Sequence, residues 1–220
     1  MYFSVIIILT KGQWKVNVTN GPLPVLFCSL AFLPRKCIIN IEKVAGTNSL
    51  CMKNVRRKEV FMTNQFLAPG AHVLGDVTLG NNVGIWYNAV VRGDSGPIQI
   101  DDDANVQDNC TVHTDPGFHV HIGKGVTIGH NAIVHGCTIG ENTIIGMGSI
   151  LLSGATVGKN CIIGAGSLVT GKMNIPDNSL ALGNPARVIR PLTEDEIEAN
   201  HKNAEHYVML MKEELKSRPR

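Results

Sequence analysis

A six-residue period dominates the middle of this 220-residue chain. Every sixth residue from Ile139 onward is aliphatic, and small residues stand two places earlier in most repeats. This period is neither the helical one of about 3.6 residues nor a simple strand alternation. A short strand followed by a corner, repeated three times per coil, predicts a parallel β-helix with triangular coils of about eighteen residues. The aliphatic residues are expected to point inward, and glycines that follow them, such as Gly140 and Gly158, to take the turn conformation.

The series of aliphatic residues at six-residue intervals continues upstream with interruptions. Its members are Val73, Leu79, Ile85, Val91, Val106, Val112, Ile122, Ile128, Val134, Ile139, Ile145, Leu151, Val157, Ile163, Val169 and Ile175. The step from Val134 to Ile139 is five residues, so one corner is a residue short. Residues 97–103 and 114–121 break the period and are predicted to be loops. The fold class is therefore β, with a β-helix domain at 62–190.

A helix is predicted after Pro191, in the segment 191–220. Thr193 and Glu196 have the spacing of a capping box. Apolar residues then follow at three-, four- and seven-residue intervals, which places them on one helical face. They are Ile197, Ala204, Val208, Met211 and Leu215. Because one helix cannot bury this face alone, we expect it to lie along the β-helix of its own or a neighbouring subunit.

The first part of the chain, residues 1–61, differs from the remainder in charge. It has nine Lys and Arg against two acids, whereas residues 62–220 have eleven against sixteen. It shows no sustained helical or strand period. A basic, acid-poor leader is typical of a transit peptide, and a signal peptide fits less well. A start at Met62, with the upstream residues translated in error, is slightly favoured over both.

Composition excludes several classes of protein. A net charge of +2, aromatic residues at 5% and the lack of a long basic run argue against nucleic-acid binding. No apolar stretch reaches the roughly 20 residues that a membrane span needs. The six cysteines form no CxxC pair, which argues against zinc-ribbon and redox motifs. Cys110, Cys137 and Cys161 fall on small-residue positions and are predicted to be buried thiols of a cytoplasmic protein.

Three histidines are candidate metal ligands: His113, His130 and His135. Their intervals are seventeen and five residues. In a coil of about eighteen residues, His113 and His130, seventeen residues apart, would lie nearly above one another if the loop between them is ignored. His130 and His135, five residues apart, would lie on adjacent faces of the triangle. The three could hardly converge within one subunit, but they could do so between subunits. Zinc commonly takes three imidazoles and a water; histidines that only fill an interface groove fit the spacing equally well.

Longer motifs around these histidines resemble the γ-class carbonic anhydrases. They are Val91-Arg92-Gly93-Asp94, Asn105-Val106-Gln107-Asp108-Asn109, Ile128-Gly129-His130-Asn131 and His135-Gly136-Cys137, with Gly183-Asn184-Pro185 ahead of the C-terminal helix. The resemblance implies a left-handed β-helix that forms a homotrimer with metal sites at its three interfaces. It implies that a hydroxide on zinc, or on ferrous iron, attacks CO2 and forms bicarbonate.

The resemblance also implies roles for individual residues. His113 and His135 would bind the metal from one subunit and His130 from the adjacent one. Gln107 would orient the hydroxide or substrate, with Asn105 close by. The remaining implied residues are Arg92 and Asp94, as a pair between subunits that shapes the site, and Asp108, which supports it. A purely structural salt bridge of the trimer is an equally good interpretation of the Arg92 and Asp94 pair.

The chain departs from the family pattern in two places. Ser95 stands where some members have an acid, and the segment 114–121 is short and has no glutamate to carry protons. His119 or His121 could carry them instead, because imidazole titrates near neutral pH. Tyr207, on the final helix, is a weaker candidate for lining the site. Low hydration activity would be consistent with these departures.

Two other functions remain open. Many hexapeptide-repeat trimers transfer acyl groups from coenzyme A with a histidine as general base. Against this stand the three histidines in metal-site motifs and the short loop. The second alternative is a metal-binding trimeric homologue with little or no catalysis.

Overall fold

The computed structural model describes residues 64–217 and, upstream of them, the backbone of four strands. These strands are β1 (Phe3–Thr10), β2 (Gln13–Asn20), β3 (Ile39–Lys43) and β4 (Leu50–Asn54). They form an antiparallel sheet of order β1-β2-β4-β3 within a unit that ends at Arg57. These strands were not expected from the sequence, because the segment shows no sustained strand period. A run such as Val5–Leu9 is apolar throughout and does not alternate. The origin of residues 1–61 stays a prediction.

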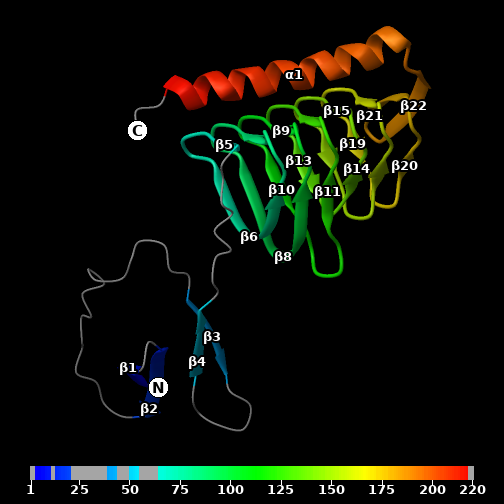
Figure 1. Ribbon diagram of the computed structural model, residues 1–220. Coiled ribbons are helices and arrows are strands. Elements are labelled where there is room, and N and C mark those ends of the chain that lie inside the picture. The colour runs from blue at the N-terminus through cyan, green and yellow to red at the C-terminus, as the bar shows by residue number, and fades with distance from the viewer. Residues whose placement is uncertain (1–2, 11–12, 21–38, 44–49, 55–63, 218–220) are drawn as a thin grey trace. The chain divides into compact units, whose positions relative to one another are not determined.

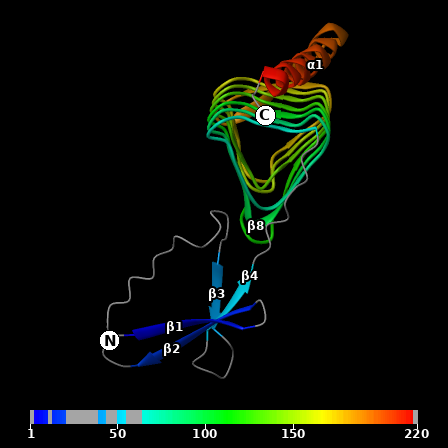
Figure 2. The ribbon, with the colours of Figure 1, turned by 60° about the vertical axis from the view of Figure 1, so that its left-hand side comes forward.

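The second unit is the predicted parallel β-helix (Figure 1). Its strands are β5 (Phe66–Leu67), β6 (His72–Leu79), β7 (Gly84–Ile85), β8 (Val90–Ile100), β9 (Asn105–Val106), β10 (Thr111–His113), β11 (Val120–Ile122), β12 (Thr127–Ile128), β13 (Ile133–His135), β14 (Thr138–Ile139), β15 (Ile144–Ile145), β16 (Ile150–Leu151), β17 (Thr156–Val157), β18 (Ile162–Ile163), β19 (Leu168–Val169), β20 (Asn174–Ile175), β21 (Ser179–Gly183) and β22 (Ala186–Pro191). Pairing between coils is parallel, and within residues 64–217 only β21 and β22 pair antiparallel. Figure 2 shows the triangular outline of the stacked coils.

Inward aliphatic residues stack directly on one another from coil to coil. Ile128 pairs in register with Ile145, and Ile145 with Ile163, and all three are fully buried. The first step is seventeen residues and the second eighteen, which confirms that one corner is a residue short. Burial of each such side chain contributes about 1.5–3 kcal/mol, so the column contributes substantially to the stability of the unit.

The corners correct one expectation about glycine. Gly140 and Gly158, which follow inward aliphatic residues, are not in the left-handed region of φ. A Cβ at Gly140 would instead lie 2.6 Å from the backbone nitrogen of Lys159 in the next coil, so close approach requires these glycines. The left-handed positions come two residues later and are often asparagine, as at Asn142 and Asn160. Asparagine tolerates this conformation better than most residues.

The two predicted loops differ from each other in the structure. Pro97–Asp103 is not a loop, because β8 continues through Ile100 and only Asp101–Asp103 turn. Segment 114–121 is a loop as far as His119, and β11 begins at Val120. The long strand β8 pairs with β10 through Val90–Arg92 and with β11 through Ile98–Ile100. The two ends of β8 therefore belong to two different faces of the triangular coil.

The helix α1 (Glu194–Ser217) begins with the predicted capping box. The Thr193 backbone N–H donates to Glu196 Oε2 over 2.9 Å, and the Glu196 N–H donates to Thr193 Oγ1 over 3.2 Å. The helix lies on its own β-helix, over β5, β7 and β9 (Figures 1 and 2). No helix in the described part of the chain is long and apolar enough to cross a membrane.

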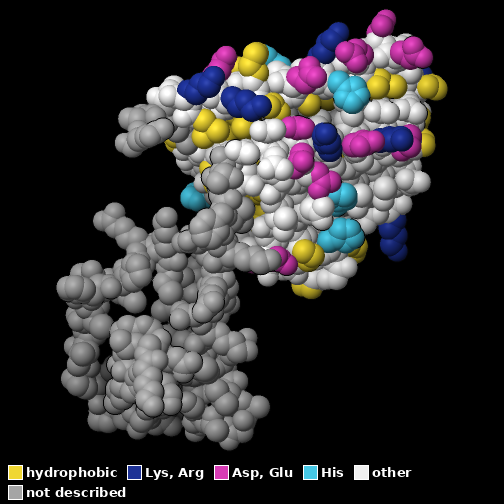
Figure 3. All heavy atoms as spheres, in the orientation of Figure 1, with side chains coloured by type: hydrophobic (Ala, Val, Ile, Leu, Met, Phe, Trp, Pro, Cys, Tyr) yellow, Lys and Arg dark blue, Asp and Glu magenta, His cyan; other side chains and the backbone are white. Residues whose placement is uncertain are grey.

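The buried face of α1 matches the predicted stripe only in part. Ala204 and Met211 are buried, whereas Leu215 is 40% exposed. Asn200, between Ile197 and Ala204 on the same face, is also buried and donates to the carbonyls of Asn142 and Cys161 over 3.1 and 3.2 Å. On the face seen in Figure 3, acidic and basic side chains mix along the outer side of α1.

Cys110, Cys137 and Cys161 are buried and free, as predicted. Burial raises the pKa of the Cys110 thiol to about 11 and that of Cys137 to about 12. Both are therefore protonated and unreactive at neutral pH. The side chains of Cys28, Cys37 and Cys51 lie outside the described residues.

We expect Met211→Ala to lower the free energy of unfolding by about 2–5 kcal/mol, because Met211 packs against Phe66 and Trp86. Met209→Ala is the matched control, since Met209 is 52% exposed on the same helix. It should change stability by no more than about 0.5 kcal/mol. Urea unfolding followed by circular dichroism measures both. Equal effects of the two variants would show that α1 is not docked as described.

We expect the stabilisation by Glu196 to disappear in acid. Hydrogen bonds from Arg190 and from the Thr193 backbone lower the pKa of Glu196 to about 2. Because the folded pKa is below the unfolded value of about 4.5, the stabilisation is complete above pH 4.5 and is lost as the pH falls towards 2. The difference in unfolding midpoint between wild type and Glu196→Gln should close over this range. Glu198→Gln, which loses only an exposed pair with Lys202, should show little difference at any pH.

Candidate functional site

Two of the three candidate histidines meet on one face of the β-helix. His113 ends β10 and His135 ends β13, and the two residues pair in register. His113 Nδ1 lies 3.1 Å from His135 Nε2. Counting about eighteen residues per coil places His113 nearly above His130 before the loop is allowed for. In the structure its neighbour in the column is His135, because the loop at 114–119 lengthens this coil.

The outer nitrogen of each imidazole is already engaged. Asp94 Oδ1 lies 3.0 Å from His113 Nε2, and Ser153 Oγ lies 2.9 Å from His135 Nδ1. Partners of this kind fix ring orientation in metal sites. Two nitrogens bound at 2.0–2.1 Å to one tetrahedral zinc would be about 3.3 Å apart, so the facing nitrogens fit a shared metal ion.

His130 lies elsewhere in the same chain, in the turn after β12. Its Nδ1 is 2.9 Å from Asp108 Oδ2, and its backbone N–H donates to Gln107 Oε1 over 3.2 Å. Within residues 64–217 no group of three or more His, Cys, Asp or Glu side chains is arranged to hold a metal ion. One chain thus offers two histidines in one place and a third in another.

Arg92 and Asp94 both lie on β8 and pair with each other. Arg92 Nη1 donates to Asp94 Oδ2, while the other carboxylate oxygen of Asp94 contacts His113. Desolvation raises the pKa of Asp94, but the hydrogen bonds of Arg92 and His113 outweigh it, so the net pKa is lowered. This pair forms within one chain, whereas the resemblance implies a pair between subunits.

Asn105 and Gln107 belong to a buried chain of polar side chains. Gln107 Nε2 donates to Asn105 Oδ1 over 3.2 Å, and Asn105 Nδ2 donates to Thr127 Oγ1 over 2.8 Å. Asn203, on α1, donates to the same hydroxyl oxygen over 2.8 Å. Asn105, Gln107 and Thr127 are each no more than 4% exposed.

Tyr207 is half-buried beside this chain of side chains. Its ring packs edge-on against Trp86 at 5.7 Å. Burial, more than the charge of Asp108, raises the pKa of Tyr207, and a hydrogen bond with Gln107 lowers it in part. Tyr207 therefore lies next to Gln107. Whether it lines a catalytic site stays a prediction.

Three contact residues had no signal in the sequence. Ser153 and Thr127 occupy ordinary polar positions of the repeat, and Asn203 lies among helix positions that the periodicity indicates as polar. Only the rotation of α1 about its axis and the lateral register of the coils bring these residues to the histidines and amides. Neither quantity can be read from residue spacing.

His119 and His121 are not brought to His113 or His135 within the chain. His121 sits beside the far end of β8, where its Nε2 lies 2.7 Å from Asp101 Oδ2. Desolvation raises the pKa of Asp101, but hydrogen bonds from Gln99 and His121 give a net lowering. Pro97, Gln99, His119, Val120 and His121 line a small cavity of about 210 Å³.

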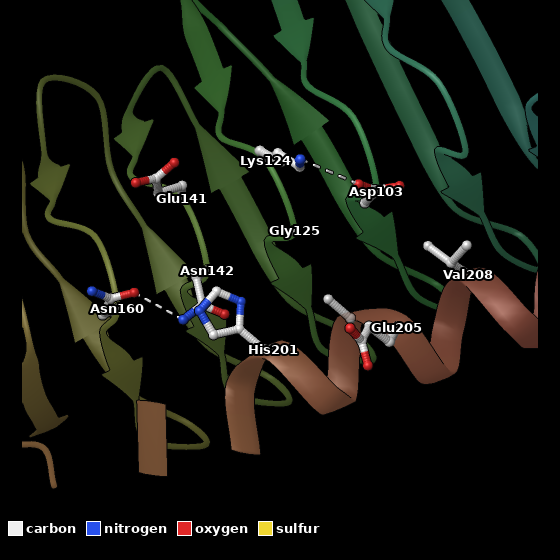
Figure 4. A pocket seen from close by; sticks show the side chains of 10 residues that line it. Asp103, Lys124, Gly125, Glu141, Asn142, Asn160, His201, Glu205 and Val208 are labelled. Atoms are coloured by element: carbon white, nitrogen blue, oxygen red, sulfur yellow. Dashed lines mark hydrogen bonds and ion pairs between the residues drawn. The ribbon is translucent and has the colours of Figure 1, made fainter. Parts of the chain in front are cut away.

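A larger cavity of about 630 Å³ lies between α1 and one corner of the coils (Figure 4). Its wall includes Asp103, Lys124, Glu141, Asn142, His201 and Glu205. Lys124 and Asp103 form an ion pair there. None of the candidate site residues lines it. The histidine pair lies instead on an outer face of the β-helix.

We expect Asn105→Ala to lower the free energy of unfolding by about 1–3 kcal/mol, because it leaves the buried Gln107 amide without an acceptor. Asn174→Ala, at an exposed strand position, is the control and should be nearly neutral. Urea unfolding of both variants makes the comparison. A neutral Asn105→Ala would mean that the buried amides find other partners.

Comparisons with known proteins place the chain among hexapeptide-repeat proteins. The family model for the bacterial transferase hexapeptide (six repeats) matches residues 119–151 and 136–171. The chain is 52% identical over 147 residues to a probable carbonic anhydrase of Methanocaldococcus jannaschii, which covers 67% of this chain and 92% of that protein. It is 43% identical to the mitochondrial gamma carbonic anhydrase 1 of Arabidopsis thaliana, over 64% of this chain and 54% of that protein. The chain thus spans about half of the plant relative.

A crystal structure of a putative acetyltransferase from Bacillus cereus is also similar. It superposes with a TM-score of 0.70 at 41% identity and covers 71% of this chain and 91% of that one. Similarity therefore extends to proteins that carry two different functional names.

Proposed function

The chain belongs to the γ-class carbonic anhydrase family, and we propose that it converts CO2 reversibly to bicarbonate at metal centres between the subunits of a homotrimer. The observation that carries the proposal is the pair of facing nitrogens of His113 and His135, 3.1 Å apart, with the other nitrogen of each ring engaged.

The proposed metal is zinc, with ferrous iron as the alternative, and the third ligand is His130 of a neighbouring subunit. The separate position of His130 in the chain supports this division, because no third candidate ligand joins the pair within residues 64–217. Three neutral imidazoles are a common zinc ligand set. When bound, the metal would supply water that is activated for attack at neutral pH.

An apolar surface beside the histidine pair supports a subunit interface there. Ile133 and Ile150 pair in register on adjacent strands and are 38% and 37% exposed, and Leu152 is 38% exposed. His135 lies on the same strand as Ile133. Exposed aliphatic residues in neighbouring positions are typical of surfaces that bind another protein, and a second copy of this chain would bring its own His130.

The other candidate residues have distinct proposed roles. Gln107 uses an amide hydrogen to hold an oxygen of the substrate, and Asn105 fixes the orientation of that amide. Asp94, paired with Arg92, orients His113, and Asp108 orients His130 in the same way. His119 or His121 remains the proposed proton carrier, since both line a cavity.

Acyl transfer is the second candidate function. The similarity to a structure named a putative acetyltransferase favours it. The His113 and His135 pair argues against it, because a general base needs one free imidazole rather than two that face each other. We propose a cytoplasmic location, since Cys110, Cys137 and Cys161 are all free and disulfides are rare in reducing compartments.

The test combines metal analysis with stopped-flow CO2 hydration on anaerobically purified protein. We expect about one zinc or iron per subunit, and His113→Ala and His130→Ala should each lose both the metal and the activity. His72→Ala, an exposed histidine outside the site, is the control and should retain both.

Mixed trimers of His113→Ala and His130→Ala subunits give the sharpest result. Each mixed trimer contains one interface with all three histidines, so random mixing should restore about a quarter of the sites. No recovery would place the histidines in one subunit and contradict the shared site. Metal without hydration would indicate a metal-binding homologue, and acyl transfer from acetyl-coenzyme A without any metal would overturn the proposal.

A further inference from the structure

The two buried amides Gln107 and Asn105 have one possible hydrogen-bond direction. The His130 backbone N–H can only donate, and it donates to Gln107 Oε1 over 3.2 Å. Gln107 must therefore direct Nε2 to Asn105, whose Oδ1 accepts at 3.2 Å. Asn105 in turn must direct Nδ2 to Thr127. A flip of the Gln107 or the Asn105 amide would bring two donors or two acceptors face to face.

Thr127 is where this chain of hydrogen bonds meets the helix. Its Oγ1 accepts from Asn105 Nδ2 and from Asn203 Nδ2, both at 2.8 Å. A hydroxyl oxygen has two lone pairs, so these two donors use all of its accepting capacity. Thr127 is 3% exposed, and water therefore does not replace it as the acceptor.

We propose that Thr127 and Asn203 are positioning residues that hold the Gln107 amide in one orientation, with Nε2 directed to Asn105 and to Tyr207 at the place where the substrate would bind. The inference rests on the proposed function for the substrate, but the hydrogen-bond chain itself does not. Asn203 fixes the rotamer of the Thr127 hydroxyl, Thr127 fixes Asn105, and Asn105 fixes Gln107. Buried networks of this kind are cooperative, so the loss of one acceptor affects every amide along it.

The primary test removes the hydroxyl without changing the shape of the side chain. Thr127→Val should lower kcat/KM for CO2 hydration about tenfold at unchanged metal content, mainly through kcat. Thr127→Ser keeps the hydroxyl and should recover most of this loss. Asn203→Ala should give a smaller decrease in the same direction. Unchanged kinetics in Thr127→Val would overturn the proposal.

Asn200→Ala is the matched control on the helix. Asn200 also anchors α1 to the coils, but it donates to the carbonyls of Asn142 and Cys161 and does not reach Thr127. It should lower the unfolding midpoint and leave kcat/KM unchanged. If Asn200→Ala and Asn203→Ala reduce kcat/KM equally, Asn203 acts only by docking the helix, and its positioning role is wrong.

A double-mutant cycle shows whether Thr127 acts through Gln107. In the Gln107→Ala background, Thr127→Val should cause no further decrease in kcat/KM. Additive decreases would show that Thr127 acts independently and would contradict the inference.

A measurement that needs no activity separates this inference from the proposed function. The side-chain amide resonances of Gln107, assigned by their loss in Gln107→Ala, should shift and exchange faster with water in Thr127→Val and Asn203→Ala. They should stay in place in Thr127→Ser and Asn200→Ala. If the metal-loaded wild type hydrates no CO2 but these shifts occur, the proposed function fails and the hydrogen-bond chain stands. Unshifted resonances would overturn the chain whatever the activity.

Discussion

Parallel hydrogen bonding between successive coils is the constraint on which the rest of this structure depends. It sets which residues lie above one another, and with them the inward column of Ile128, Ile145 and Ile163. The same register places His113 beside His135. Because side chains alternate between the two faces of a strand, a slip of one residue would turn the aliphatic column outward and both imidazoles inward. Core and candidate site are therefore specified by a single pairing.

The candidate site also depends on groups whose hydrogen-bonding role cannot change. The His130 backbone N–H sets the direction of the amides that lead to Thr127, and the Asp94 carboxylate, kept anionic by a lowered pKa, can only accept. Side chains that could point either way are thus ordered by neighbours that cannot. Such ordering before the substrate arrives reduces the reorganisation needed during the reaction. It is the physical basis for assigning Gln107 and His113 distinct roles.

Much of the fold could be predicted from the sequence, because the six-residue period counts residues and regular coils repeat that count. The inward column and the short corner were predictable in this way, and the capping box was predictable from the three-residue spacing of Thr193 and Glu196. The pairing of His113 with His135 was not predictable from spacing, since an irregular coil lies between them and its length in space does not follow from its number of residues. The contact of Asn203 with Thr127 depends on how α1 is rotated over the coils, which a stripe of apolar residues defines only within about one position. Asparagine at the left-handed corners was missed because glycine is the more obvious residue for that conformation.

The helix and the coils it covers have nearly the same repeat distance. A helical turn advances about 5.4 Å and a coil about 4.8 Å, so each turn of α1 meets roughly one coil. Asn200 reaches the coil of Asn142, Asn203 the coil of Thr127, and Met211 the first coils at Phe66 and Trp86. Each repeat of such a protein contacts only its neighbours. Here the loss of one coil would displace the contacts of α1 by one helical turn. The number of coils and the length of the helix can therefore change only together.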